Sequence, residues 1–173
     1  MARPPPDVVR DLAASCVQFA TRTLGVSPDY TPETLPLLDH YIRQVPDDAA
    51  EEVLGLLVPA CGAYFGEVAR QRLGDGTWSC SEEDYESWRL TFDRCSIRFN
   101  PIGVAVEVAL MEPAEGWTAE FKVAEEDRER GRAAVDVLGE VQEADYFSFA
   151  VRFEVLEQLY KALAPDEPPG DGD

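Results

Sequence analysis

The apolar positions of the first 73 residues recur at steps of three and four, the spacing of helices that bury one face. The first predicted helix begins near Asp7 and is ended by Gly25. The second lies within 31–46, where Thr31 is the expected N-cap and Pro46 closes the segment. A third helical region begins at 47 and is expected to break or kink at Pro59. The expected buried face of the second helix is Leu35, Leu38, Tyr41 and Ile42.

Alternation of apolar and polar residues between 77 and 99 predicts a small antiparallel sheet. A short strand is expected at 77–80, after a turn at 74–76. Two further strands would pair as a hairpin near 87–99, across a two-residue turn at Asp93-Arg94. In this register three apolar pairs share one face, which supports the pairing. The pairs are Phe92 with Cys95, Leu90 with Ile97, and Trp88 with Phe99.

Helical spacing returns after the hairpin. Asn100-Pro101 is a good N-cap and first-turn pair for an apolar helix that we expect to be buried. Residues 125–142 have helical spacing, and the length of 145–164 favours a helix there. The alternation leaves open whether 117–123 and 146–153 are strand or helix. The fold class is therefore α+β, with N-terminal helices, a small antiparallel sheet and C-terminal helices.

The 173 residues suit one α+β domain at 7–164, between a flexible Pro-rich lead-in at 1–6 and a disordered acidic tail at 165–173. The net charge is −19, from 34 acids and 15 Lys and Arg residues. This charge opposes binding to nucleic acid and to anionic membranes. It is compatible with a basic protein partner, although plain solubility is the simpler explanation. The N-terminus lacks the pattern of a signal peptide, and no window approaches the roughly 18 consecutive apolar residues that a membrane span needs, so we expect a cytoplasmic protein.

The stretch ACGAYFGEVARQRLGDGTW at 60–78 is the most patterned part of the chain. Gly62 and Gly66 would lie on one helix face, where the close approach of a neighbouring backbone best explains two glycines. Glu67 and Arg70 point away from that face, as an ordinary surface pair would. The alternative makes Glu67 a general base that Arg70 orients.

The run GAYFGEVARQRLG at 62–74, followed by Thr77-Trp78, resembles a helix–strand signature in a family of small uncharacterised bacterial proteins. The stretch FNPIGVAVEVAL at 99–110 and the closing helix strengthen the resemblance, which covers about 50–160. It implies a bacterial cytoplasmic origin and an α+β fold. It supplies no catalytic residue and no cofactor.

Familiar catalytic and cofactor motifs are absent from the sequence. His40 is the one histidine, and no GxSxG accompanies it, so a position at the surface or the core edge is expected. The four cysteines are widely spaced, which argues against zinc and against a disulfide framework. The chain has neither GxxxxGK[ST] nor GxGxxG. Carboxylate sites for Mg²⁺ or Ca²⁺ stay open, but we assign no metal, no cofactor and no catalytic residue.

One pair of cations stands out in the predicted hairpin. Arg89 and Arg98 would face each other on the side away from the core, and like charges in this position are destabilising. They therefore need an acidic neighbour, a bound anion or a partner's carboxylate. An internal salt bridge is the simplest answer. An anion or partner site is one alternative, and a wrong hairpin register is the other.

The sequence favours a non-enzymatic acidic interaction protein, of immunity or adaptor type, that binds a basic partner. The immunity role is an analogy, since small acidic α+β proteins often fill it. Two alternatives stay open. One is an enzyme with a carboxylate and arginine pocket that lacks a familiar motif, and the other is a self-assembling structural protein.

Overall fold

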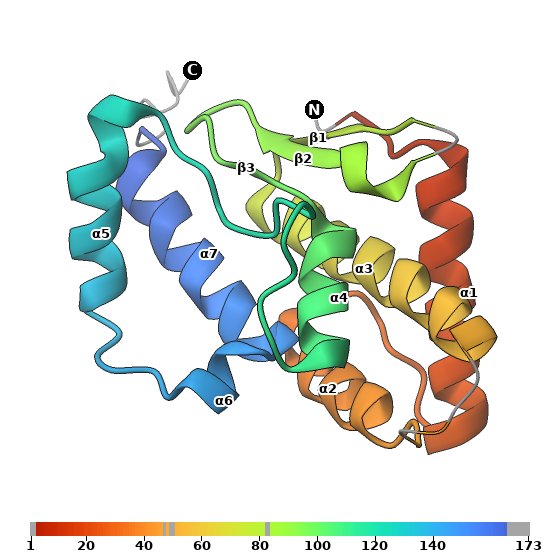
Figure 1. The fold of residues 1–173 in the computed structure, drawn as a ribbon. Coiled ribbons are helices and arrows are strands. Elements are labelled where there is room, and N and C mark those ends of the chain that lie inside the picture. Colours follow the sequence, from red (N-terminus) through yellow and green to blue (C-terminus); the bar gives the residue numbers. More distant parts are fainter. Residues whose placement is uncertain (1–2, 47, 49–50, 82–83, 166–173) are drawn as a thin grey trace.

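The computed structural model describes residues 3–46, 48, 51–81 and 84–165, and within them seven α-helices accompany a small three-stranded antiparallel sheet. Helices lie at both ends of the chain and flank the sheet (Figure 1), which confirms the α+β class. Residues 166–173, most of the predicted tail, lie outside the described residues.

Helix α3 (Glu51–Leu73) is the centre of the fold. Between Leu57 and Arg70 every residue except Val58 is buried, since α1 (Asp7–Leu24), α4 (Pro101–Leu110), the sheet and α7 (Phe149–Leu163) all pack on it. Of the predicted break or kink at Pro59, the break does not occur, because the helix continues through this residue. The packing of its neighbours on both sides outweighs the one backbone hydrogen bond that proline removes.

The two predicted N-terminal helices are present. Helix α1 ends at Gly25, whose φ of 71° is the left-handed C-cap conformation that glycine favours. Helix α2 (Leu35–Arg43) follows a 3₁₀ turn at Pro32–Thr34 and buries all four residues of the predicted face. The Thr31 side chain does not cap it. The Asp29 carboxylate instead accepts hydrogen bonds from the Thr31 amide and hydroxyl.

The two glycines of α3 are explained by close packing. A Cβ on Gly62 would lie 2.7 Å from the Cα of Ile102 in α4, as the backbone-approach interpretation requires. At Gly66 the close neighbour is a side chain, because a Cβ there would lie 2.3 Å from the Trp78 indole. The glycine face therefore allows both α4 and the first strand to pack closely on α3.

The sheet has the order β1 (Gly76–Ser79), β2 (Arg89–Phe92), β3 (Arg98–Phe99), with both pairs antiparallel. A strand at 77–80 and a hairpin near 87–99 were expected, but the predicted hairpin register is wrong. Leu90 pairs with Phe99 and Thr91 with Arg98, and the Phe92 amide donates to the Ile97 carbonyl, so four residues form the turn. The Asp75 carboxylate accepts the Arg94 amide at 2.9 Å and so holds Asp93-Arg94 within a longer turn.

Asn100 caps α4 as predicted, because its side-chain oxygen accepts the amides of Ile102 and Gly103. Most of 117–123 is not strand. Thr118 has a φ of 52°, outside the strand region, and the stretch forms one isolated bridge, from Lys122 to Arg98.

The C-terminal part is helical, which answers the ambiguity at 146–153. Helix α6 (Glu143–Tyr146) precedes α7, and the Ser148 hydroxyl caps α7 by accepting the Val151 amide. The helix expected over 125–142 is shorter, since a 3₁₀ turn at Glu125–Asp127 leads into α5 (Arg128–Asp136). Gly139 has a φ of 80°, and the stretch beyond α5 is irregular. In Figure 1, α5 stands at the edge of the molecule, packed on α7.

Candidate functional site

The structure separates Arg89 from Arg98, the two predicted anion-site residues. Arg89 is used internally: its guanidinium donates to the carbonyls of Glu86 and Trp88 and to the Thr118 hydroxyl. Arg98 pairs across the hairpin with Thr91. The shift of the register by two residues keeps both arginines on the same side of the sheet but ends their direct opposition.

Arg98 nevertheless faces a like charge. On its other side it forms an antiparallel bridge with Lys122, in which each backbone amide donates to the other's carbonyl, at 3.0 and 2.9 Å. Side chains of such a pair stand on the same face. The predicted opposition of Arg89 and Arg98 is therefore wrong, and the like charge opposite Arg98 is Lys122.

Both residues line a groove of about 1090 Å³. One wall is formed by β3 and the segment 120–124, the other by α5, and residues of α7 also line it. Arg128 and Arg132, one helical turn apart, line the α5 side. Four cations of a strongly acidic chain thus gather around one groove.

None of these four side chains forms a hydrogen bond or ion pair within the part of the chain that the structure describes. Other cations do find carboxylates there. The ion pairs involve Arg10, Arg70, Arg72, Arg130, Arg152 and Lys161. The groove also contains the acids Asp93, Glu120 and Asp136, which do not reach the four cations.

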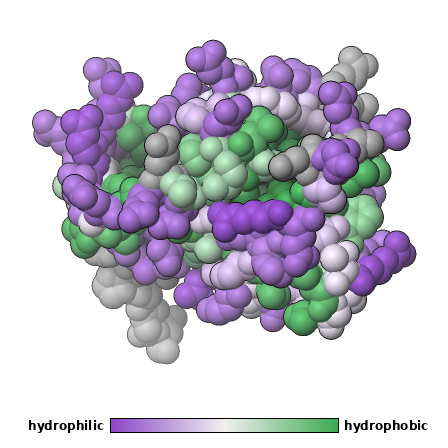
Figure 2. All heavy atoms as spheres, turned by 60° about the horizontal axis from the view of Figure 1, so that its bottom comes forward, coloured by the Kyte–Doolittle hydropathy of each residue, from purple (hydrophilic) through white to green (hydrophobic). Residues whose placement is uncertain are grey.

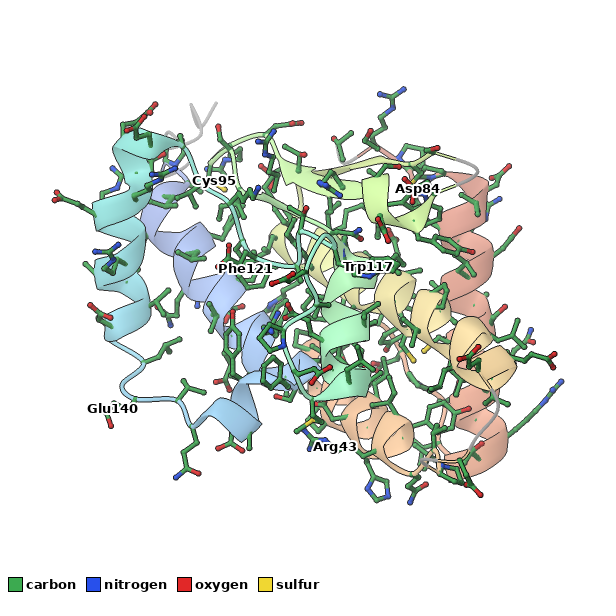
Figure 3. All side chains as sticks on the ribbon, viewed as in Figure 1. Arg43, Asp84, Cys95, Trp117, Phe121 and Glu140 are labelled. Atoms are coloured by element: carbon green, nitrogen blue, oxygen red, sulfur yellow. The ribbon has the colours of Figure 1, made fainter. Side chains whose placement is uncertain are left out.

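Part of the groove lining is apolar and aromatic. Val155 and Leu159 of α7 line it, together with Phe121, which lies near α7 in the middle of the view in Figure 3. Tyr146 lines it as well, with the Arg152 guanidinium 3.8 Å from its ring centre. Burial raises the pKa of the Tyr146 phenol, so this side chain stays neutral.

Arg152 is a buried charge that sequence reasoning missed. It pairs with Glu107 of α4, and its Nε donates to the Tyr146 carbonyl at 2.9 Å. The signal was an arginine inside the otherwise apolar run 149–153. Its partner could not be identified, since Glu107 is 45 residues away.

Glu67 and Arg70 are buried, so the expectation of an ordinary surface pair is wrong. Glu67 is 2 % exposed and Arg70 9 %. Two guanidinium nitrogens donate to the two Glu67 oxygens at 2.8 Å, and the Trp78 indole donates to Glu67 Oε1 at the same distance. The remaining Arg70 nitrogen donates to the Arg3 carbonyl. This network ties α3 to β1 and to Arg3, and both Glu67 oxygens accept hydrogen bonds from buried donors of the fold.

A second hollow, of about 740 Å³, lies between α2 and the start of α7. Asp39, His40 and Arg43 line it, and Arg43 and Glu140 mark this lower side of the molecule in Figure 3. Asp39 is buried, which raises its pKa, although it accepts the amides of Phe149 and Ala150 at 2.6 and 3.2 Å. His40 is exposed, as expected, and contacts Gln44.

The described residues contain no group of three or more His, Cys, Asp or Glu arranged to hold a metal ion. All four cysteines are free thiols, and three are buried. Helix α3 is long and apolar enough to cross a membrane, but 67 % of its most apolar window is buried inside the protein, as in the core helix of a soluble domain.

Comparison with protein-family models, with curated proteins and with solved structures gave no match. The resemblance to small uncharacterised bacterial proteins therefore stays a prediction.

Proposed function

We propose that this protein is a non-enzymatic acidic interaction module, of immunity or adaptor type, which binds a basic protein partner in the cytoplasm. The observation that carries the proposal is where the acids lie. Among the described residues, Asp39 and Glu67 are the buried acids, and both are held by donors of the fold. The excess negative charge therefore lies at the surface, where it can attract a basic partner.

The shape of one face supports an interaction role. In Figure 2, hydrophilic residues form most of the outline and surround a central apolar area. Protein interfaces commonly have this arrangement of an apolar centre inside a polar rim.

An enzyme with a carboxylate and arginine pocket is the alternative, and the hollow beside Asp39 and Arg43 is where it would act. Asp39 has the raised pKa that a catalytic acid often has. Its two oxygens, however, hold the first amides of α7. We therefore assign it a structural role, as the residue that anchors α7 on α2.

Capture from a lysate of the native cells tests the proposal. The full chain is immobilised at low salt, and bound proteins are eluted with a salt gradient. We expect one dominant basic protein. Once purified, it should bind with a dissociation constant that rises at least tenfold between roughly 50 and 300 mM salt, because screening weakens exposed charge contacts.

Charge variants give the matched control. Neutralising the exposed acids Glu33, Glu51 and Glu52 to glutamine should weaken binding, whereas neutralising the exposed Arg22 to glutamine should not. No saturable partner in repeated captures would contradict the proposal.

A further inference from the structure

The groove between β3 and α5 brings cations together from two sides. Arg98 and Lys122 line one wall, and Arg128 and Arg132 line the other, with apolar residues of α7 between them. All four side chains are exposed, so their charged ends are available to a ligand that enters the groove.

This arrangement carries an electrostatic cost that no ion pair among the described residues relieves. Like charges opposed across a bridge are destabilising, and the Arg98–Lys122 pair has no carboxylate within ion-pair distance. The chain has more than twice as many acids as Lys and Arg residues, so acidic neighbours are in plentiful supply. A bound anion would supply the missing counter-charge.

The lining also indicates what kind of anion fits. Val155, Leu159, Phe121 and Tyr146 offer apolar and aromatic surface next to the charges. Sites for small molecules are mostly apolar concavities with a few placed polar groups, roughly 300–1,000 Å³ in volume. The groove, at about 1090 Å³, is slightly larger than that range.

Two considerations favour a small ligand of low charge. The four cations share the groove with three acids, Asp93, Glu120 and Asp136, so its lining is positive by only one charge (4 − 3). A large acidic partner would also meet the repulsion of a molecule with a net charge of −19. A small anion inside the groove lies within about one Debye length, roughly 8 Å at physiological salt, of the groove cations and is screened from more distant charges.

We propose that this groove binds a small organic anion that joins one carboxylate or phosphate group to an apolar or aromatic body. The anionic group lies between Arg98 and Lys122 on one side and Arg128 and Arg132 on the other. The apolar body lies on α7 and against Phe121. This site is separate from the acidic surface of the proposed function, so either proposal can fail without the other.

Binding of defined probes to the full chain tests the site. Phenyl phosphate and phenylacetate separate the two anionic groups, and benzyl alcohol is the matched neutral compound. We expect at least one anion to bind saturably, at least tenfold more tightly than benzyl alcohol. Equal binding of the anions and the alcohol would overturn the proposal, and that comparison needs no variant.

Variants then locate the site. Arg98→Gln with Lys122→Gln, and separately Arg128→Gln with Arg132→Gln, should each weaken anion binding about tenfold, because each removes two charge-assisted contacts. The control, Arg10→Gln with Arg22→Gln, removes two exposed arginines of α1 and should change it less than twofold. Circular dichroism checks that each variant is folded. Unchanged binding in both groove variants would overturn the proposal.

A truncated chain that ends at Pro165 tests whether residues 166–173 of the chain itself occupy the groove. If anions bind only after the acidic residues 166–173 are removed, the groove is reserved for a segment of this chain and the small-molecule proposal is wrong.

Discussion

Arg98 and Lys122 lie opposite each other in an antiparallel bridge, joined by two backbone hydrogen bonds of 3.0 and 2.9 Å. Two cations stand side by side at the rim of the groove, in a chain with a net charge of −19. The repulsion between the two cations therefore lowers the stability of the fold, while the same two charges favour binding of an anion.

Lys122→Gln should raise the free energy of unfolding by roughly 0.2–1 kcal/mol, the usual range for a cross-strand pair. Urea denaturation at low salt measures it, and the gain should shrink at 1 M salt because screening already weakens the repulsion. A variant that is less stable than the wild type at low salt would show that Lys122 has a favourable partner.

The glycines of α3 give a matched pair. Gly66→Ala should destabilise the protein by roughly 1–3 kcal/mol or more, because the new Cβ would collide with the Trp78 indole. Gly55→Ala, in the same helix with nothing within 4 Å of the added Cβ, should stabilise it by up to roughly 1 kcal/mol. Thermal unfolding of both variants checks this, and equal effects at the two positions would contradict the packing described for the glycine face.

Glu67→Ala should cost roughly 3–5 kcal/mol, because it leaves the buried Arg70 guanidinium without its counter-charge. Adding Arg70→Leu should restore part of that loss, since both charges are then gone. Trp78 fluorescence should change in the single variant, because the indole loses its acceptor. A cost below about 1 kcal/mol would be typical of a surface pair and would contradict burial of the network.

The thiols should react slowly in the folded protein. Burial raises the pKa of Cys80 and of Cys95 to about 11, from an ordinary value of 9.0. At pH 8 this lowers the thiolate fraction roughly a hundredfold, and only the thiolate is nucleophilic. Alkylation should show four free thiols in urea and very slow labelling without it, with Cys80 first because it is the least buried. Fewer than four thiols in urea would contradict the free cysteines.

The periodic parts of the fold could be predicted from sequence. The first helix, the capped helix after Asn100 and the buried face of 35–42 follow from spacing and end signals, which are local. The hairpin register could not be obtained in this way, because the contact that sets its turn comes from Asp75, 19 residues before Arg94.

Only part of the candidate site could be predicted from the sequence. A Glu and an Arg three residues apart have the same spacing on a surface helix and on a buried one. The burial of Glu67 and Arg70 depends on contacts with Trp78 and Arg3, which are distant in sequence, so it could not be predicted. Arg98 was identified through a predicted opposition to Arg89, but the like charge opposite it is Lys122, in a stretch that the alternation left open as strand or helix. The position of the α5 wall depends on the packing of α5 on α7, and no local sequence pattern predicts this packing.

The most direct test of the groove is an NMR titration of the isotope-labelled wild-type protein with phenyl phosphate. We predict saturable shifts of backbone amides in two separate stretches, around Lys122 and around Arg132, with a single dissociation constant. Shifts spread over the surface without saturation, or confined to residues outside the groove, would contradict it.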